Sequence, residues 1–153
     1  TAYADINDRL KAHTDHTGRD LQTYVLFMVI AAATDEDAQA KWENYNAGAD
    51  MEAINWLMNQ GGKDQTSGSD TNIRQMASSV SPVNINMGTI VGSFENVATM
   101  LDEISEIKGT EGILLTFDDF IQGVEDFGQR IQPLMKCRED VVATYQEENQ
   151  KRH

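Results

Sequence analysis

One stretch of the chain decides the fold class: Thr23-Tyr24-Val25-Leu26-Phe27-Met28-Val29-Ile30-Ala31-Ala32. Its residues are apolar without alternation, and many of them are β-branched or aromatic. This composition is typical of a strand covered on both faces, as in a parallel sheet. A buried helix has a similar composition, but Gly18 before the stretch and Thr34-Asp35 after it favour a strand.

A second stretch, 112–117, has the same composition and predicts a second buried strand. Helical spacing of apolar residues surrounds both strands. It predicts helices over about 4–17 and 50–60, and after Thr34, Ser93 and Asp118-Asp119. Thr34 and Ser93 can cap the helices that they precede. Strands that alternate with helices indicate βαβ units and a parallel sheet, and hence an α/β fold.

The predicted sheet is incomplete, because only two stretches are convincing strands. Regular structure resumes at 87–92, but the pattern there assigns no element type. A complete α/β barrel needs eight strands and typically about 250 residues, whereas this chain has 153. We therefore expect a piece of a larger barrel, with the other strands in an amino-terminal segment or another chain. A mostly helical structure with a minimal, covered sheet is the alternative.

The helix after Asp118-Asp119 shows the clearest apolar face in the second half of the chain. Its spacing predicts that four side chains point into the core: Phe120, Val124, Phe127 and Ile131. Pro133 lies near the expected end of this helix.

The net charge indicates which kinds of binding partner are unfavourable, and the cysteine content indicates the redox compartment. With 12 basic and 25 acidic residues, the formal net charge is −13. An acidic surface repels phosphate backbones and anionic lipids, which argues against nucleic acid and membrane partners. The single cysteine, Cys137, allows no internal disulfide, and this favours a reducing, cytoplasmic location. The longest apolar run, 24–33, is too short for a membrane-spanning helix.

Few residues carry recognisable chemistry. His13 and His16 have metal-ligand spacing, but no third ligand lies nearby, and a surface pair is the simpler interpretation. Cys137 has no Cys-x-x-Cys partner and is interpreted as an inert thiol. Asp118-Asp119 directly follows a strand, where barrel enzymes place functional groups, although either aspartate could simply cap the next helix.

The polar region 63–86 is a candidate functional loop, because loops of this length inside a compact domain are usually functional or disordered. Arg74 could close over an anionic ligand, or it could be an exposed arginine. Asn84 and Asn86 could bind a polar heterocycle, or they could satisfy loop backbone groups. The chain contains no Gly-x-Gly-x-x-Gly or Walker motif, so these residues alone do not define a reaction.

Longer sequence blocks carry a resemblance to a known family. The two most specific are Asn84-Ile85-Asn86-Met87-Gly88-Thr89-Ile90-Val91-Gly92-Ser93 and Leu114-Leu115-Thr116-Phe117-Asp118-Asp119-Phe120. Together with 18–31, 70–77 and 127–135, they resemble the carboxyl-terminal part of the pyrimidine monooxygenases of uracil degradation. These enzymes belong to the bacterial-luciferase-like flavin monooxygenases. The resemblance covers about 1–138, and the charged tail 139–153 carries no signal.

The resemblance implies the carboxyl-terminal part of a (β/α)8 (TIM) barrel. Residues 24–32 would form strand seven and 113–117 strand eight. An insertion at about 34–92 would separate them, with 63–87 near the mouth of the active site. Residues 1–138 would thus form one barrel segment, followed by the tail.

The resemblance also implies a reaction. Reduced FMN and molecular oxygen would open the uracil ring and give a ureidoacrylate-type product. A separate NADH-dependent flavin reductase would supply the reduced FMN, and the enzyme would be a homo-oligomer. A non-catalytic fragment or interaction module, or a related monooxygenase acting on another small substrate, is the alternative.

Site residues are harder to assign, because in this family the FMN and oxygen contacts come mainly from the amino-terminal half. We expect this segment alone to be inactive. The near-site candidates for catalysis are Asn84, Asn86, Phe117 and Asp118, and Arg74 is the candidate cofactor-binding lid residue.

Overall fold

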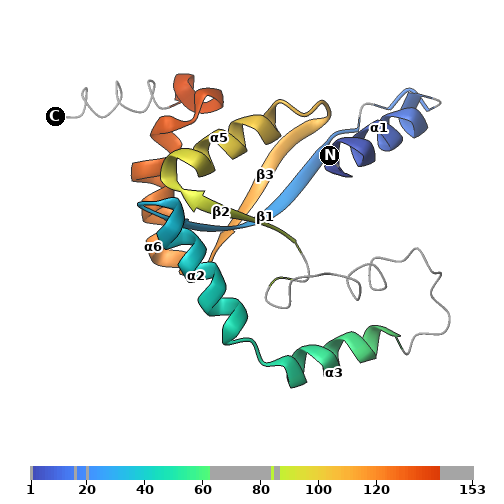
Figure 1. Ribbon diagram of the computed structural model, residues 1–153. Coiled ribbons are helices and arrows are strands. Elements are labelled where there is room, and N and C mark those ends of the chain that lie inside the picture. The colour runs from blue at the N-terminus through green and yellow to red at the C-terminus, as the bar shows by residue number, and fades with distance from the viewer. Residues whose placement is uncertain (1, 16, 20, 63–83, 85–86, 142–153) are drawn as a thin grey trace.

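The computed structural model describes residues 2–15, 17–19, 21–62, 84 and 87–141. Its centre is a parallel three-stranded sheet in the order β2-β1-β3 (Figure 1). The strands are β1 (Thr23–Ala32), β2 (Gly88–Ser93) and β3 (Thr110–Phe117). The predicted α/β class and parallel sheet are confirmed, and β1 has the bounds of the stretch that predicted it.

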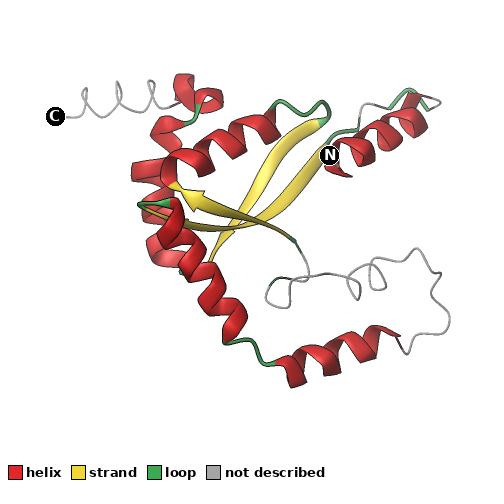
Figure 2. Ribbon diagram, viewed as in Figure 1, coloured by secondary structure: helices red, strands yellow, loops and turns green. Residues whose placement is uncertain are grey.

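Helix α1 lies at the amino-terminal end of β1, α2 lies at its carboxyl end, and α5 lies over the sheet (Figure 2). They are α1 (Ala2–Asp15), α2 (Asp35–Ala47), α3 (Met51–Gly62), α5 (Phe94–Ser105) and α6 (Phe120–Asp126). A π turn η1 (Phe127–Ile131) and the 3-10 turns η2 (Gln132–Leu134) and η3 (Lys136–Arg138) follow α6. Within the described part of the chain, every helix is too short or too polar to cross a membrane.

Strand β1 lies in the centre of the sheet, between β2 and β3. We expected its neighbours to lie outside the chain, and for β1 this expectation is wrong. It pairs with β2 from Phe27–Gly88 to Ala32–Ser93, and with β3 along most of its length. The sequence pattern did not reveal β2 because it has only six residues and two of them are glycines. Glycine weakens the strand signal, since it offers no side chain to pack.

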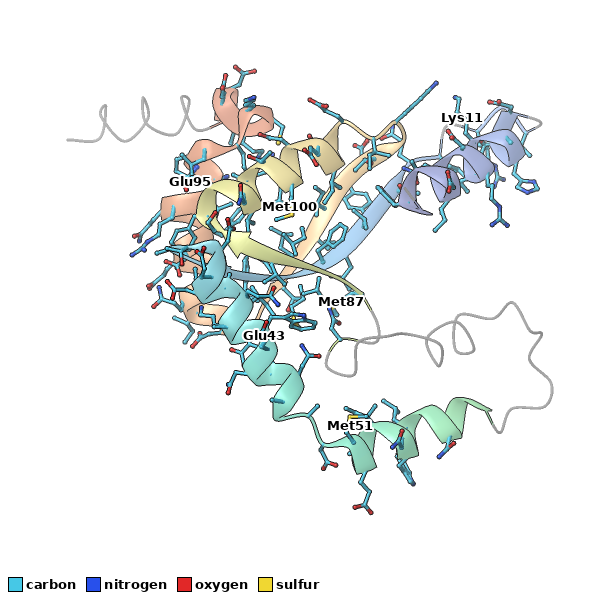
Figure 3. The ribbon with its side chains drawn as sticks, in the orientation of Figure 1. Lys11, Glu43, Met51, Met87, Glu95 and Met100 are labelled. Carbon is cyan, nitrogen blue, oxygen red and sulfur yellow. The ribbon has the colours of Figure 1, made fainter. Side chains whose placement is uncertain are left out.

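One face of the sheet is covered by α5 and the turns after α6. Val97, Ala98 and Leu101 of α5 are buried against Val29 and Ile90 of the sheet. Ile131 and Met135 complete this core, and Phe27, Ile113, Leu115 and Phe117 pack against it. Met100 also reaches from α5 toward Gly92, where an added Cβ would lie 3.3 Å from Met100 Cε (Figure 3).

The opposite face is open over its amino-terminal half. Side chains alternate along a strand, so Tyr24 and Leu26 point away from α5, and the parallel register places Leu114 beside Leu26. Tyr24 is 64% exposed and Leu114 54% exposed. We call Tyr24, Leu26 and Leu114 the open face. Within the described residues, the prediction that β1 and β3 are covered on both faces is therefore wrong in this half.

The predicted inward face of the last helix is wrong in its first half. Phe120 is 69% exposed and Val124 is also exposed, whereas Ile131 is buried and Phe127 is half-buried. The side of α6 that approaches the sheet is at Gly123, where an added Cβ would clash with Phe117 Cβ. The π turn then changes the helical phase, so a single 3.6-residue spacing does not describe both parts.

Helix α3 stands apart from the sheet (Figure 1). Its apolar side chains Met51, Trp56 and Leu57 are exposed, and Met51 lies on the far side of the molecule from α5 (Figure 3). The chain from α2 to α3 therefore leaves the core at the end of α2.

Candidate functional site at the carboxyl edge of the sheet

The carboxyl ends of all three strands meet at one edge of the sheet, which we call the carboxyl edge. Three polar residues follow or end the strands there: Asp35 after β1, Ser93 at the end of β2 and Asp118 after β3. In parallel α/β folds this edge is the usual place for binding and catalytic groups, because the loops that follow the strands converge there.

Asp118 binds two side chains of α2, and we call Lys41, Tyr45 and Asp118 the Asp118 cluster. Tyr45 Oη donates a hydrogen bond to Asp118 Oδ2 at 2.8 Å. Lys41 Nζ lies 3.9 Å from the same oxygen and donates to the Ala31 carbonyl at 3.0 Å. The Asp118 side chain is only 13% exposed. The cluster thus links the carboxyl ends of β1 and β3 to one side of α2.

The two adjacent aspartates differ in role. Asp119 is the cap of α6, since its Oδ1 accepts a hydrogen bond from the Gln122 backbone N–H at 3.1 Å. Asp118 is not the cap and reaches across to α2 instead. The capping interpretation is therefore confirmed for Asp119, which leaves Asp118 at the carboxyl edge.

The hydrogen bond with Asp118 favours the protonated form of Tyr45. The hydrogen bond to Asp118 raises the pKa of Tyr45 above 10.0, and partial burial and the negative charges of Asp118 and Asp119 act in the same direction. Tyr45 is therefore a proton donor throughout the neutral range. The cluster combines one carboxylate acceptor with a hydroxyl donor and an ammonium donor.

Asp35 forms a second polar junction at the carboxyl edge. Its Oδ1 accepts from the Ser93 backbone N–H at 2.7 Å, and its Oδ2 accepts from Asn96 Nδ2 at 2.6 Å. The hydrogen bond from Ser93, followed by that from Asn96, lowers the pKa of Asp35 below 3.8. The sequence showed Asp35 only as an acid in the first turn of a helix, so this contact between elements was missed.

At the carboxyl end of β2, the polar groups of Ser93 are hydrogen-bonded to Asp35 and Asn96. Ser93 Oγ accepts from the Asn96 backbone N–H at 3.3 Å, which confirms Ser93 as the cap of α5. Thr34 likewise caps α2, accepting from the Asp37 backbone N–H at 3.1 Å.

The other predicted near-site residues lie in different places. Phe117 packs in the core, with its ring centroid 6.2 Å from that of Phe127. Asn84 is 8% exposed, and its Nδ2 donates to Thr89 Oγ1 at 2.7 Å and to the Gly88 carbonyl at 3.3 Å. Asn84 thus stabilises the amino-terminal end of β2. Asn86 and Arg74 lie outside the described residues.

A small cavity adjoins the Asp118 cluster. It has a volume of about 30 Å³ and is bordered by Lys41, Asp118 and Gln122 on its polar side and by Val29 and Ile131 on its apolar side. A space of this size holds water but not a heterocycle. The described residues therefore form part of a wall at this edge rather than a closed site.

Within the described residues, the remaining candidates for chemistry do not gather into a site, and His16 of the predicted His13–His16 pair lies outside the described residues. Among the described residues, no group of three His, Cys, Asp or Glu side chains could hold a metal ion. Partial burial raises the pKa of the Cys137 thiol, and the hydrogen bond with Asp102 adds to this effect. A raised pKa favours the thiol over the reactive thiolate, in line with an inert cysteine.

The amino-terminal end of the sheet carries a separate polar network. Tyr3 Oη lies 2.7 Å from Thr23 Oγ1 and 3.1 Å from Thr110 Oγ1. The buried Asn7 accepts from Thr23 Oγ1 at 2.8 Å and donates to the Lys108 carbonyl at 3.1 Å. These contacts hold α1 against β1 and β3 at the end where barrel folds place stabilising rather than catalytic groups.

Comparison with known proteins adds the family context. No family model matches the chain. A protein of Acinetobacter baylyi described as pyrimidine monooxygenase RutA is 81% identical over 146 residues, which are 95% of this chain. The resemblance to the pyrimidine monooxygenases is confirmed. The corresponding RutA proteins of Rhizobium rhizogenes and Serratia proteamaculans are each 64% identical over 92% of the chain.

The chain spans about 40% of the length of these curated pyrimidine monooxygenases: 40%, 39% and 38% in the three cases. Among solved structures, DmoA from Hyphomicrobium sulfonivorans superposes with a TM-score of 0.61 over 88% of this chain and 34% of DmoA. Its sequence identity is 21%, so this likeness concerns the fold alone.

Proposed function

We propose that this chain forms the carboxyl-terminal part of the (β/α)8 barrel of a flavin-dependent pyrimidine monooxygenase. The observation that carries the proposal is the 81% identity to the Acinetobacter baylyi protein across 95% of this chain. Identity at this level, spread over the sheet and the helices around it, supports a common architecture and a common reaction.

The uncovered surface of the sheet supports completion of a barrel. In a barrel, helices cover the outer face of each strand and the other face points inward. The face that packs on α5 corresponds to the outside, and the open face of Tyr24, Leu26 and Leu114 corresponds to the interior.

The outer edge of β3 is also uncovered. Within the described residues β3 pairs with β1 alone. A groove of about 680 Å³ runs beside β3, with Leu114, Phe127 and Met135 in its lining. The share of the relatives that this chain does not match, about 60% by difference from the 40% that it covers, would supply the neighbouring strands.

The longer protein would use reduced FMN and molecular oxygen to open the uracil ring. A separate NADH-dependent flavin reductase would supply the reduced FMN, and the reaction would take place in the cytoplasm in a homo-oligomer. The cavity of about 30 Å³ at the carboxyl edge does not accommodate a flavin ring system. We therefore assign the main FMN contacts to the rest of the longer protein.

Within this chain, the proposal assigns the near-site role to the carboxyl edge. Asp118 is placed there with Lys41 and Tyr45. In the proposed insertion, Asn86 remains a proposed near-site residue and Arg74 a proposed cofactor-binding lid residue. The insertion was expected at about 34–92. The carboxyl-terminal end of that range overlaps β2, which pairs with β1 and is part of the sheet.

A hybrid enzyme tests the proposal. In it, the matched 146 residues of the Acinetobacter baylyi protein are replaced by those of this chain. With FMN, NADH, a flavin reductase and oxygen, we expect uracil consumption within about tenfold of the parent, equivalent to about 1.4 kcal/mol of activation free energy. A folded hybrid that retains FMN but leaves uracil unchanged contradicts the proposal. Turnover of a different small heterocycle in place of uracil would overturn the substrate assignment.

A further inference from the structure

A small buried apolar contact and several polar contacts attach α2 to the sheet. Ala38 is the buried residue of α2. Asp35 and Lys41 make hydrogen bonds to the ends of the strands and to α5, and Tyr45 donates to Asp118, which follows β3. Lys41 and Tyr45 are four residues apart and therefore lie on the same side of the helix. Both reach the single carboxylate of Asp118, which makes Asp118 the main anchor of the second half of α2.

The attachment of α2 is separate from the hydrophobic core. The main hydrophobic cluster lies on the α5 side of the sheet and contains no residue of α2, although Ala38 is fully buried outside that cluster. Helix α3, which follows α2, exposes Met51, Trp56 and Leu57. Segments with few buried contacts open locally without unfolding the whole protein. Loss of the Asp118 contacts should therefore loosen the second half of α2 while the sheet and α5 stay folded.

We propose that Asp118, Tyr45 and Lys41 are positioning residues that hold α2 across the carboxyl edge, where it forms one wall of the pyrimidine site. This inference rests on the proposed function. The cluster joins the end of the last strand to the helix after β1, so one oxygen atom, Asp118 Oδ2, fixes the distance between the two elements. Displacement of α2 would open the site to water and weaken the hold on the substrate without removing a reacting group.

The hybrid enzyme carrying Tyr45→Phe tests the inference, because this change removes one hydroxyl and leaves the ring. Loss of a hydrogen bond to a charged group should raise the KM for uracil about tenfold, with a smaller change in kcat. Hydrogen exchange of the backbone amides of α2 should accelerate by about the same factor. Asp118→Asn should have an effect in the same direction, and Asp118→Glu should restore part of it.

Two matched controls separate positioning from general stability. Tyr3→Phe removes a tyrosine hydroxyl that contacts Thr23 and Thr110 at the opposite end of the strands. Asp119→Asn alters the adjacent aspartate, which caps α6. Both should lower thermal stability slightly and leave the KM for uracil and the exchange of α2 unchanged.

The outcomes distinguish this inference from the proposed function. Unchanged KM and unchanged α2 exchange in Tyr45→Phe overturn the positioning role, as does an equal effect of Tyr3→Phe. If the folded hybrid has no uracil turnover at all, the proposed function fails. In that case the positioning of a pyrimidine site fails with it, and the exchange data show only whether the cluster holds α2.

Discussion

At the scale of single residues, Asp118 and Asp119 show what a sequence can and cannot reveal. The pair was visible as two acids after a predicted strand, and both a capping and a functional role were open. Only the structure shows that Asp119 caps α6 and that Asp118 binds Tyr45. Tyr45 lies 73 residues away from Asp118 in sequence, so the local sequence pattern around either residue cannot predict the contact. The same holds for Asp35 and its contact with Ser93, 58 residues away.

The acid stability of the protein should depend on Asp35. The pKa of Asp35 is lowered in the folded state by its hydrogen bonds to Ser93 and Asn96. A lowered folded-state pKa stabilises the fold above the unfolded value of 3.8, and this contribution is lost as the pH falls through the folded-state pKa. Asp35→Asn should therefore flatten the acid side of the stability profile, measured by urea unfolding of the hybrid enzyme between about pH 2 and about pH 6. Identical pH profiles for the two proteins would refute this role.

A second carboxylate, Asp102, should anchor the chain after α6. Burial tends to raise the pKa of Asp102, but the backbone N–H groups of Cys137 and Lys136 donate to it and lower the pKa overall. Asp102→Ala should destabilise the hybrid enzyme by about 1–2 kcal/mol in urea unfolding, because two amides lose an acceptor. Glu103→Ala, an exposed neighbour on the same helix, is the control and should change stability by less than about 0.5 kcal/mol. Equal effects of the two substitutions would argue against the anchor.

At the scale of elements, the strength of the local signal decided what could be predicted. The bounds of β1 could be predicted because its ten consecutive residues are all apolar, β-branched or aromatic. β2 was missed because it is short and contains Gly88 and Gly92. The inward face after Asp119 was half wrong because a π turn follows a seven-residue helix and shifts the phase. Periodicity thus predicts long regular elements and fails where two short ones join.

Helix α5 should be the element on which the covered face depends most. Leu101 is among the largest fully buried side chains, and it lies in the core with Val29 and Ile90. Leu101→Ala should lower the free energy of unfolding of the hybrid enzyme by about 2–5 kcal/mol, through lost burial and the cavity that remains. Thermal and urea unfolding would measure the change, again with Glu103→Ala as the exposed control. A loss below about 1 kcal/mol would show that the core does not centre on α5.

At the scale of the whole molecule, the sheet has a protected face and an exposed apolar face. The sequence predicted apolar cover on both sides of the strands, and within the described residues the structure provides most of it on the α5 side. The unmatched part of the longer relatives accounts for the difference if it completes a barrel around the open face. The prediction of an incomplete sheet is wrong for β1, which has both neighbours within the chain, and stays a prediction for the outer edge of β3.

The open face should be buried in the hybrid enzyme. Leu114→Ser should then cost about 2 kcal/mol or more in unfolding free energy, because a hydroxyl replaces apolar area in a closed interior. Val141→Ser, a half-exposed apolar residue beyond η3, serves as the control and should be close to neutral. If Leu114→Ser is as harmless as Val141→Ser, the open face stays in contact with water and the barrel interpretation fails.

The fate of oxygen in the hybrid enzyme shows whether this chain completes a working pyrimidine monooxygenase. Purified hybrid is mixed with reduced FMN, uracil and isotopically labelled dioxygen, and the products are analysed by mass spectrometry. We expect a ring-opened product that carries label from dioxygen. A folded, FMN-retaining hybrid that reoxidises the flavin and leaves all uracil intact and unlabelled would contradict the claim that this chain supplies the carboxyl-terminal part of a pyrimidine monooxygenase.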